Sequence, residues 1–122
     1  MGKSAVKEKS FSFALHVVKL FQKLQEQKEF VLSKQLLKAG TSIGANVREA
    51  INAESSPDFV HKLSIAQKEC DETLYWLEIL HYSGYIKESE FSTAKTEADE
   101  LLKIIRSIII TTKFKHTNRQ NS

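Results

Sequence analysis

The chain contains a single cysteine, a single proline and only four glycines among its 122 residues. Cys70 cannot form a disulfide within the chain, and this cysteine usage is typical of a protein in a reducing cytosol. The four histidines are dispersed and have no further thiols beside them, which excludes a zinc site of familiar spacing. Turns are rich in proline and glycine, so the low number of both residues predicts few turns and long helices.

Long apolar runs are also missing. No uninterrupted stretch of about 18 apolar residues occurs, which a membrane-spanning helix would need. The first ten residues include Lys3, Lys7 and Lys9 where a secretion signal would have an apolar core. With 41% hydrophobic and 27% charged residues, the composition is that of an ordinary globular domain. We therefore expect a cytoplasmic protein that is neither secreted nor in contact with a membrane.

The sequence contains no recognisable set of catalytic residues. Gly40 and Gly44 have no strand before them and no Lys-Ser/Thr after them, which excludes a phosphate-binding loop. Glu69 and Glu72 lie one helical turn apart, as in half of a di-iron site, but the pair of Glu-x-x-His motifs that such a site requires is missing. We therefore expect no enzymatic activity, no metal and no cofactor.

Apolar residues recur with the helical period along most of the chain. The pattern predicts four helices, over residues 10–27, 32–52, 57–82 and 88–113. The clearest boundary is Ser56-Pro57-Asp58, a sequence typical of a helix start. Helices of this length joined by short loops predict an all-α fold, an up-down-up-down antiparallel four-helix bundle. We place the bundle domain at residues 1–114 and a flexible polar tail at residues 115–122.

Two glycines lie four residues apart inside the second predicted helix. Each costs roughly 0.8 to 1 kcal/mol relative to alanine in a helix interior. Close packing against a neighbouring helix would offset this loss, because a missing side chain lets another backbone approach. Asn46 lies at the edge of the same apolar stripe, where it could satisfy a backbone group. We therefore predict that Gly40, Gly44 and Asn46 are helix-packing residues.

The third and fourth predicted helices carry more apolar residues than one bundle face requires. The additional set consists of Ile65, Trp76, Ile79, Ile104 and Ile108. Exposed apolar patches of this size are usually covered by a partner. We therefore predict that these residues form the interface of a homo-oligomer. The alternative is that they broaden the core of a slightly splayed bundle.

Positive charge is concentrated towards the two ends of the sequence, although the net charge is only +3. Residues 1–62 hold ten Lys/Arg against six Asp/Glu, whereas residues 63–112 hold five against nine. Lys34, Lys38 and Arg48 fall on the outward face of the second helix and are candidate phosphate contacts. No aromatic residue of that helix shares the face, so contacts with nucleic acid should be mainly electrostatic. Further candidates lie near the C-terminus: Lys113, Lys115 and Arg119.

Residues 33–80 carry a specific pattern: QLLKAGTSIGANVREA at 35–50, DFVHKLSIAQKE at 58–69 and ETLYWL at 72–77. This pattern resembles the four-helix-bundle proteins encoded in intervening sequences of bacterial 23S rRNA genes. That fold family looks related to the accessory protein of diversity-generating retroelements, a pentamer that partners a reverse transcriptase and nucleic acid. The resemblance implies a cytoplasmic bacterial bundle that assembles into a homopentameric ring.

Two functions remain open at this stage. The first is a non-enzymatic accessory protein that binds RNA or DNA with low sequence specificity, in which a ring repeats the basic face of the second helix. The alternative is a protein-interaction scaffold that binds no nucleic acid. The expected partners are further copies of the chain, with RNA or DNA in the first case and a reverse transcriptase or another protein in the second.

Overall fold

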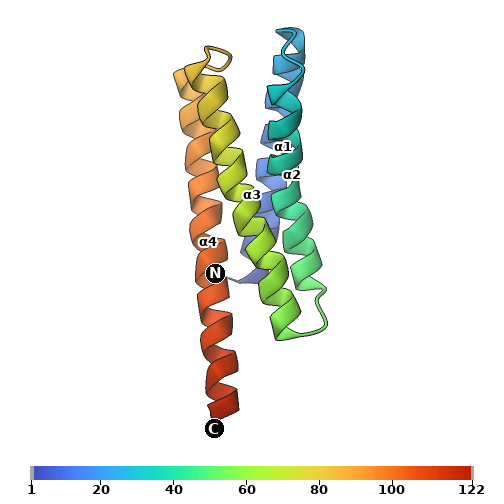
Figure 1. Cartoon of the computed structure of the whole chain (residues 1–122), viewed down its shortest axis with the longest axis vertical. Coiled ribbons are helices and arrows are strands. Elements are labelled where there is room, and N and C mark those ends of the chain that lie inside the picture. The colour runs from blue at the N-terminus through green and yellow to red at the C-terminus, as the bar shows by residue number, and fades with distance from the viewer. Residues whose placement is uncertain (1, 122) are drawn as a thin grey trace.

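The computed structural model describes residues 2–121, and the side chains of residues 2–118. The chain forms four α-helices, α1 (Lys3–Glu26), α2 (Leu32–Ile51), α3 (Ser56–Tyr82) and α4 (Glu88–Asn121). The helices run alternately up and down as an antiparallel bundle (Figure 1). No strand occurs between residues 2 and 121. The predicted all-α four-helix bundle is confirmed.

Two helices are longer than the sequence pattern predicted. α1 begins at Lys3 instead of near residue 10, because Val6 continues the apolar stripe and is buried in the core. α4 continues to Asn121, so residues 115–121, which we expected as a polar tail, extend the helix. The predicted domain boundary at residue 114 therefore lies inside α4. In Figure 1 this end of α4 projects beyond the turn that joins α2 to α3.

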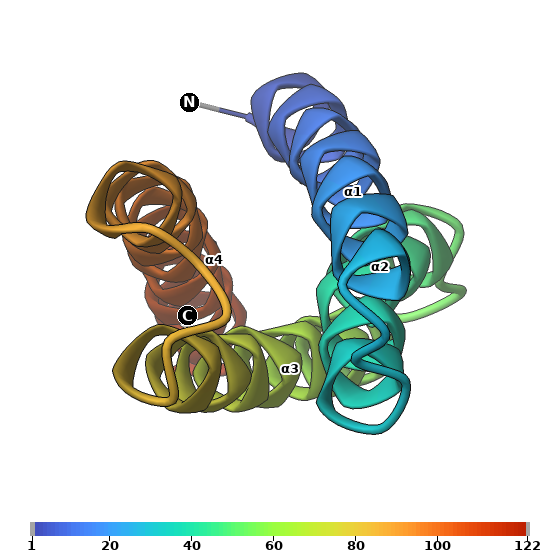
Figure 2. The ribbon, with the colours of Figure 1, turned by 90° about the horizontal axis from the view of Figure 1, so that it is seen from above.

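Each helix packs against the next one along the chain. α2 contacts α1 and α3, and α3 contacts α4, whereas the contact between α1 and α4 is the least extensive. Seen along the bundle, the four helices accordingly form an open curve with α1 and α4 at its two ends (Figure 2). An ion pair joins Lys62 of α3 to Glu49 of α2 at 3.4 Å between Nζ and Oε1.

The core draws side chains from all four helices. They recur at spacings of three or four residues, as expected for one buried face of each helix. The largest fully buried side chains of the core include Phe13, Leu24, Leu36, Ile43, Leu63, Leu77, Leu80, Leu101 and Ile105. Burial of these apolar side chains supplies the main favourable contribution to folding.

α1 and α2 approach each other closely at the two glycines of α2. A Cβ atom added to Gly40 would lie 2.7 Å from Cγ2 and 2.9 Å from Cγ1 of Val17. A Cβ atom added to Gly44 would lie 3.4 Å from both the carbonyl oxygen and the hydroxyl oxygen of Ser10. The side chain of Asn46 donates to the carbonyl oxygen of Ser42 at 2.8 Å, within α2 itself. The structure thus places both glycines against α1, with Gly40 in the tighter contact.

α2 begins at a buried carboxylate. Glu29 is only 6% exposed, and it accepts hydrogen bonds from the backbone N–H groups of Val31 at 3.0 Å, of Leu32, and of Ser33 at 3.1 Å. The first N–H groups of a helix have no partners within the helix, and a negative charge also suits the positive end of the helix dipole. The residue at the N-cap position, Val31, provides no side-chain cap. Glu29 takes over this role.

We expect the substitution Glu29→Ala to lower the free energy of unfolding by about 2 kcal/mol, because three backbone N–H groups at the start of α2 lose their charged acceptor. Glu29→Gln retains an acceptor but loses the charge, so it should cost about half as much. Urea denaturation followed by circular dichroism measures both changes. Glu26→Ala, an exposed carboxylate at the end of α1, is the matched control. Equal stability of all these variants would show that the Glu29 carboxylate does not stabilise α2.

Candidate nucleic-acid interface

Of the cations that we predicted as phosphate contacts, Lys34, Lys38 and Arg48 lie exposed on α2 and Lys113 and Lys115 lie exposed on α4, whereas the side chain of Arg119 lies outside the described residues. Lys34 and Lys38 are one helical turn apart, and Arg48 lies about 15 Å further along the helix axis. Their face is opposite to the buried stripe of the same helix. Among the described side chains, no ion pair engages Lys34 or Arg48. This face therefore presents positive charge that acidic side chains of the protein do not neutralise by direct pairing.

The charge of Lys38 is partly offset by α3. The pKa of Glu69 lies above its ordinary value of 4.5, first because partial burial raises it and then because Glu72 raises it further. The positive charges of Lys68 and Lys38 act in the opposite direction and lower this pKa. Lys38 is therefore close enough to α3 to interact electrostatically with Glu69. Of the three cations on α2, Lys34 and Arg48 have no such interaction with Glu69.

An aromatic side chain from α1 shares this surface. The guanidinium carbon of Arg48 lies 5.3 Å from the centroid of the Phe11 ring, a cation–π distance. The Phe11 ring is 51% exposed, and Leu15, one helical turn away, is 49% exposed. Phe11 belongs to α1, so the pattern of the second helix alone did not predict it as part of this surface. The available signal was that Phe11 falls outside the buried stripe of α1.

The predicted interface residues do not form one exposed patch on the protomer. Ile104 is 7% exposed and belongs to the core, and Trp76 and Ile108 pack against that core. Ile65 and Ile79 are half-buried on α3. The expectation of a contiguous exposed patch was therefore wrong. The alternative of a broadened core describes Ile104 and Ile108 better, whereas Trp76 packs on the core and remains partly exposed.

The same residues also face different neighbours. Ile104 follows Glu97 by seven residues and shares its side of α4, and Glu97 pairs with His16 of α1. Trp76 follows Glu69 by seven residues on α3, and Glu69 responds to the charge of Lys38 on α2. Ile104 thus lies on the side of α4 that meets α1, whereas Trp76 shares a side of α3 with Glu69. The predicted interface is reduced to the α3 residues Ile65, Ile79 and Trp76.

Opposite charges meet where α1 and α4 face each other, along what we call the α1/α4 seam. Ion pairs join His16 to Glu97 at 2.7 Å and Lys23 to Glu90 at 2.5 Å. A third pair, Lys9 with Glu100, lies further along. The three basic residues, Lys9, His16 and Lys23, recur every seven residues and therefore share one side of α1. A groove of about 440 Å³ between these helices is lined by Leu20 and Ala94 together with members of the ion pairs.

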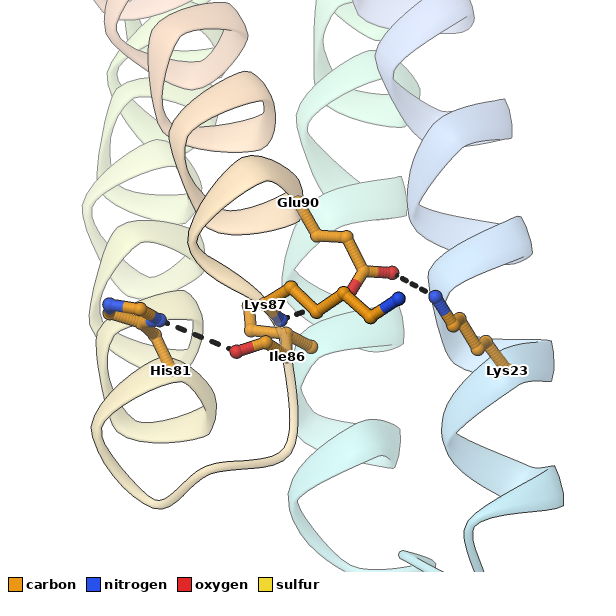
Figure 3. A network of polar contacts seen from close by, with 5 residues as sticks. All are labelled: Lys23, His81, Ile86, Lys87 and Glu90. Carbon is orange, nitrogen blue, oxygen red and sulfur yellow. Dashed lines mark hydrogen bonds and ion pairs between the residues drawn. The ribbon is translucent and has the colours of Figure 1, made fainter.

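Glu90 lies at the centre of a polar network at one end of this seam. Figure 3 shows the Lys23 and Lys87 side chains on the same side of its carboxylate, and the backbone N–H of Lys87 donates to Oε1 at 2.9 Å. Burial raises the pKa of Glu90, but the hydrogen bonds from Lys23 and Lys87 and the charges of both lysines outweigh it, so the pKa lies below the ordinary 4.5. The stabilisation from this carboxylate is therefore lost only as the pH falls through its lowered pKa.

The polar residues of the bundle do not gather into a metal site. Within residues 2–121, no three His, Cys, Asp or Glu side chains are placed to hold a metal ion. Glu78 and His81 have Glu-x-x-His spacing, but His81 is engaged by Glu88 at 2.8 Å and its ring stacks on Phe91 at 4.4 Å between centroids. Figure 3 shows its other ring nitrogen directed at the carbonyl oxygen of Ile86.

Within residues 2–121, no helix combines the length and the apolar character that a membrane span requires.

Cys70 is a free thiol that is fully buried in the core. Burial is the main reason that its pKa is raised to about 12, and the negative charges of Asp71 and Glu69 add to this effect. We expect that iodoacetamide does not label the native protein at about pH 8, because the thiolate is scarce and shielded. Mass spectrometry should show full labelling after denaturation. Rapid labelling of the native protein would show that the helices around Cys70 open readily.

The fold and its surfaces define an all-α bundle protein that carries an exposed basic helix face. The chain belongs to the family of 23S rRNA-intervening sequence proteins, whose family profile matches residues 2–107 and so includes parts of all four helices. A similar solved structure is that of a protein of unknown function from the S23 ribosomal protein family of Bacteroides thetaiotaomicron, determined at 1.70 Å resolution. The two chains are 49% identical, the match covers 89% of this chain and 98% of that chain, and the TM-score is 0.88. No curated protein matches the chain.

Proposed function

We propose that this protein is a non-enzymatic accessory protein that binds RNA or DNA through phosphate contacts from α2. The observation that carries this proposal is the exposed face that presents Lys34, Lys38 and Arg48 on one helix. Phosphate contacts release counterions, and this provides a favourable term that does not depend on base sequence. Low sequence specificity is expected, because contacts to phosphates carry no direct sequence information. We also propose a cytoplasmic location, which the free Cys70 supports.

Three cations give only weak binding at physiological salt, so the basic face becomes effective when several copies act together. We propose that the chain forms a homo-oligomer, with the pentamer implied by the family resemblance as the expected state. Ile65, Ile79 and Trp76 support a contact through α3, because these apolar side chains remain only half-buried in the protomer. The α2 cations of neighbouring protomers would then face one nucleic-acid strand.

We expect light scattering to show an oligomer of the unmodified chain at micromolar concentration. The double variant Ile65→Glu/Ile79→Glu should lower its mass towards that of a monomer, because two charges would enter an apolar contact. Ile110→Glu is the matched control, since Ile110 is 68% exposed on α4. Circular dichroism checks that each variant still folds. A monomeric unmodified chain would contradict the oligomer.

Binding itself is tested by fluorescence anisotropy with labelled oligonucleotides at low salt. The double variant Lys34→Ala/Lys38→Ala should weaken binding about tenfold, because two phosphate contacts are lost. Lys19→Ala/Lys103→Ala removes the same charge from exposed positions on α1 and α4 and should have a much smaller effect. If the unmodified protein does not bind even at low salt, this function is excluded.

The second candidate is a protein-interaction scaffold, which exposed tyrosines on α3 favour. Tyr82 is 81% exposed and Tyr75 is 57% exposed. Tyrosine is enriched where protein interfaces concentrate their binding energy. By the resemblance to retroelement accessory proteins, the partner in this case would be a reverse transcriptase. Tyr75→Ala and Tyr82→Ala should then weaken its capture and leave the anisotropy with oligonucleotides unchanged.

A further inference from the structure

We infer that the surface shared by α1 and α2 binds single-stranded nucleic acid, with one base stacked on the ring of Phe11. This inference rests on the proposed nucleic-acid binding and specifies its ligand, since α2 alone provides charge and no aromatic ring. The residues that carry it are Phe11 of α1 and Arg48 of α2, which belong to different helices and meet at 5.3 Å.

The position of Phe11 is fixed by the packing of α1 on α2. Gly44 of α2 contacts Ser10 closely, as the 3.4 Å approach of an added Cβ atom shows, and Ser10 immediately precedes Phe11. The backbone of α1 is thus held against α2 while the Phe11 ring remains 51% exposed. Because this backbone is already ordered, only the side-chain torsions of Phe11 must be fixed when a flat ligand stacks on its ring.

Cations lie on both sides of this ring. Lys7 is exposed one helical turn before Phe11 on α1, and Arg48 lies next to the ring on α2. The exposed carboxylates nearest in sequence are Glu8 on α1 and Glu49 on α2, and Glu49 pairs with Lys62 of α3. A nucleotide stacked on Phe11 would bring its flanking phosphates towards Lys7 and Arg48. The planar guanidinium of Arg48 can itself stack on a base.

The combination of a ring with cations discriminates between single and double strands. In a duplex the base faces are stacked on one another, so a protein ring reaches them only after unstacking. In a single strand the base faces are accessible, and aromatic stacking adds to the phosphate contacts without requiring a particular sequence. Phe11 should therefore contribute to single-strand binding and contribute nothing to duplex binding.

The test measures anisotropy for a labelled oligo(dT) of about 20 nucleotides, and for a blunt duplex of the same length, with the full chain. Phe11→Ala should weaken single-strand binding about tenfold and leave duplex binding within twofold. Phe11→Trp should restore single-strand binding, and its added fluorescence should be quenched by the single strand. Leu15→Ala is the matched control, because Leu15 is equally exposed on the same helix.

A second measurement separates stacking from a loss of charge or of fold. The dependence of single-strand affinity on salt should be unchanged by Phe11→Ala, because no phosphate contact is removed. Arg48→Lys keeps the charge but not the planar group, and should weaken single-strand binding more than duplex binding. Light scattering and circular dichroism should match those of the unmodified protein.

The outcomes distinguish this inference from the function on which it rests. If the unmodified protein binds neither oligonucleotide at low salt, the proposed function fails and this inference fails with it. If Lys34→Ala/Lys38→Ala weakens binding while Phe11→Ala either has no effect or weakens binding of the single strand and of the duplex equally, the stacking site is wrong and the proposed function stands. If Phe11→Ala and Leu15→Ala both lower the oligomer mass, this surface is a contact between copies of the chain, and the inference is overturned.

Discussion

The substitution Gly40→Leu is expected to lower the free energy of unfolding by about 3 kcal/mol. The first added atom alone would lie 2.7 Å from Cγ2 of Val17, closer than real Cβ contacts come. Val17 is 1% exposed, and as a β-branched residue in a helix it has one strongly preferred rotamer, so it cannot turn away. The remaining atoms of the leucine would force α1 and α2 apart. Urea denaturation followed by circular dichroism measures the change.

Alanine substitutions should affect stability differently at the two glycine positions. Alanine gains about 0.8 to 1 kcal/mol of helix propensity over glycine, so it stabilises the helix wherever a methyl group fits. At Gly44 the nearest atoms are at 3.4 Å, and Gly44→Ala should be close to neutral. At Gly40 the collision with Val17 should outweigh the propensity, and Gly40→Ala should destabilise by about 1 kcal/mol. Gly44→Leu, which cannot fit either, should cost about 1 to 3 kcal/mol.

A double-mutant cycle identifies the cause. If the Val17 side chain is what Gly40→Ala collides with, Val17→Ala should remove the collision, and the double variant should be more stable than the sum of the single effects predicts. Val47→Ala, a buried valine elsewhere on α2, is a control that should add independently. Strict additivity of Gly40→Ala with Val17→Ala would contradict the packing role of Gly40.

The sequence pattern predicted the helices well because each buries one face. Apolar spacing located all four, and Ser56-Pro57-Asp58 located the start of α3, where the Ser55 side chain accepts from the N–H of Asp58. The two ends that the pattern missed have physical reasons. In the N-terminal part of α1, before Ser10, Val6 is the only residue buried in the core, which is too little for a periodic pattern. The end of α4 is polar, so apolar periodicity did not indicate that α4 continues.

The candidate site was predictable only where it depends on one helix. Lys34, Lys38 and Arg48 share a face of α2, and the helical period alone shows this. Phe11 joins them through the alignment of α1 against α2, which no local pattern contains. The burial of Ile104 depends on how closely α4 approaches α1, and the cap by Glu29 depends on a loop conformation. Contacts between segments decide these features.

The largest expected effect on binding is that of salt. Phosphate contacts to a single strand give a slope of log K against log salt of about −0.7 for each neutralised phosphate. Three contacts per protomer, from Lys34, Lys38 and Arg48, predict a slope of about −2 for one engaged protomer. Affinity should then fall about 20-fold between 50 and 200 mM salt, and more steeply when several protomers of a ring engage one strand. Disrupting the proposed oligomer should weaken binding more than removing any single lysine.

The measurement that tests the central claim most directly is a salt titration of single-strand binding by the unmodified protein and by Lys34→Ala/Lys38→Ala. We predict a steep slope for the unmodified protein and a slope shallower by about 1.4 for the variant, because two phosphate contacts of about 0.7 each are lost. Lys19→Ala/Lys103→Ala should leave the slope unchanged. Equal slopes for all three proteins, or no binding at the lowest salt, would contradict a nucleic-acid-binding role for this face of α2.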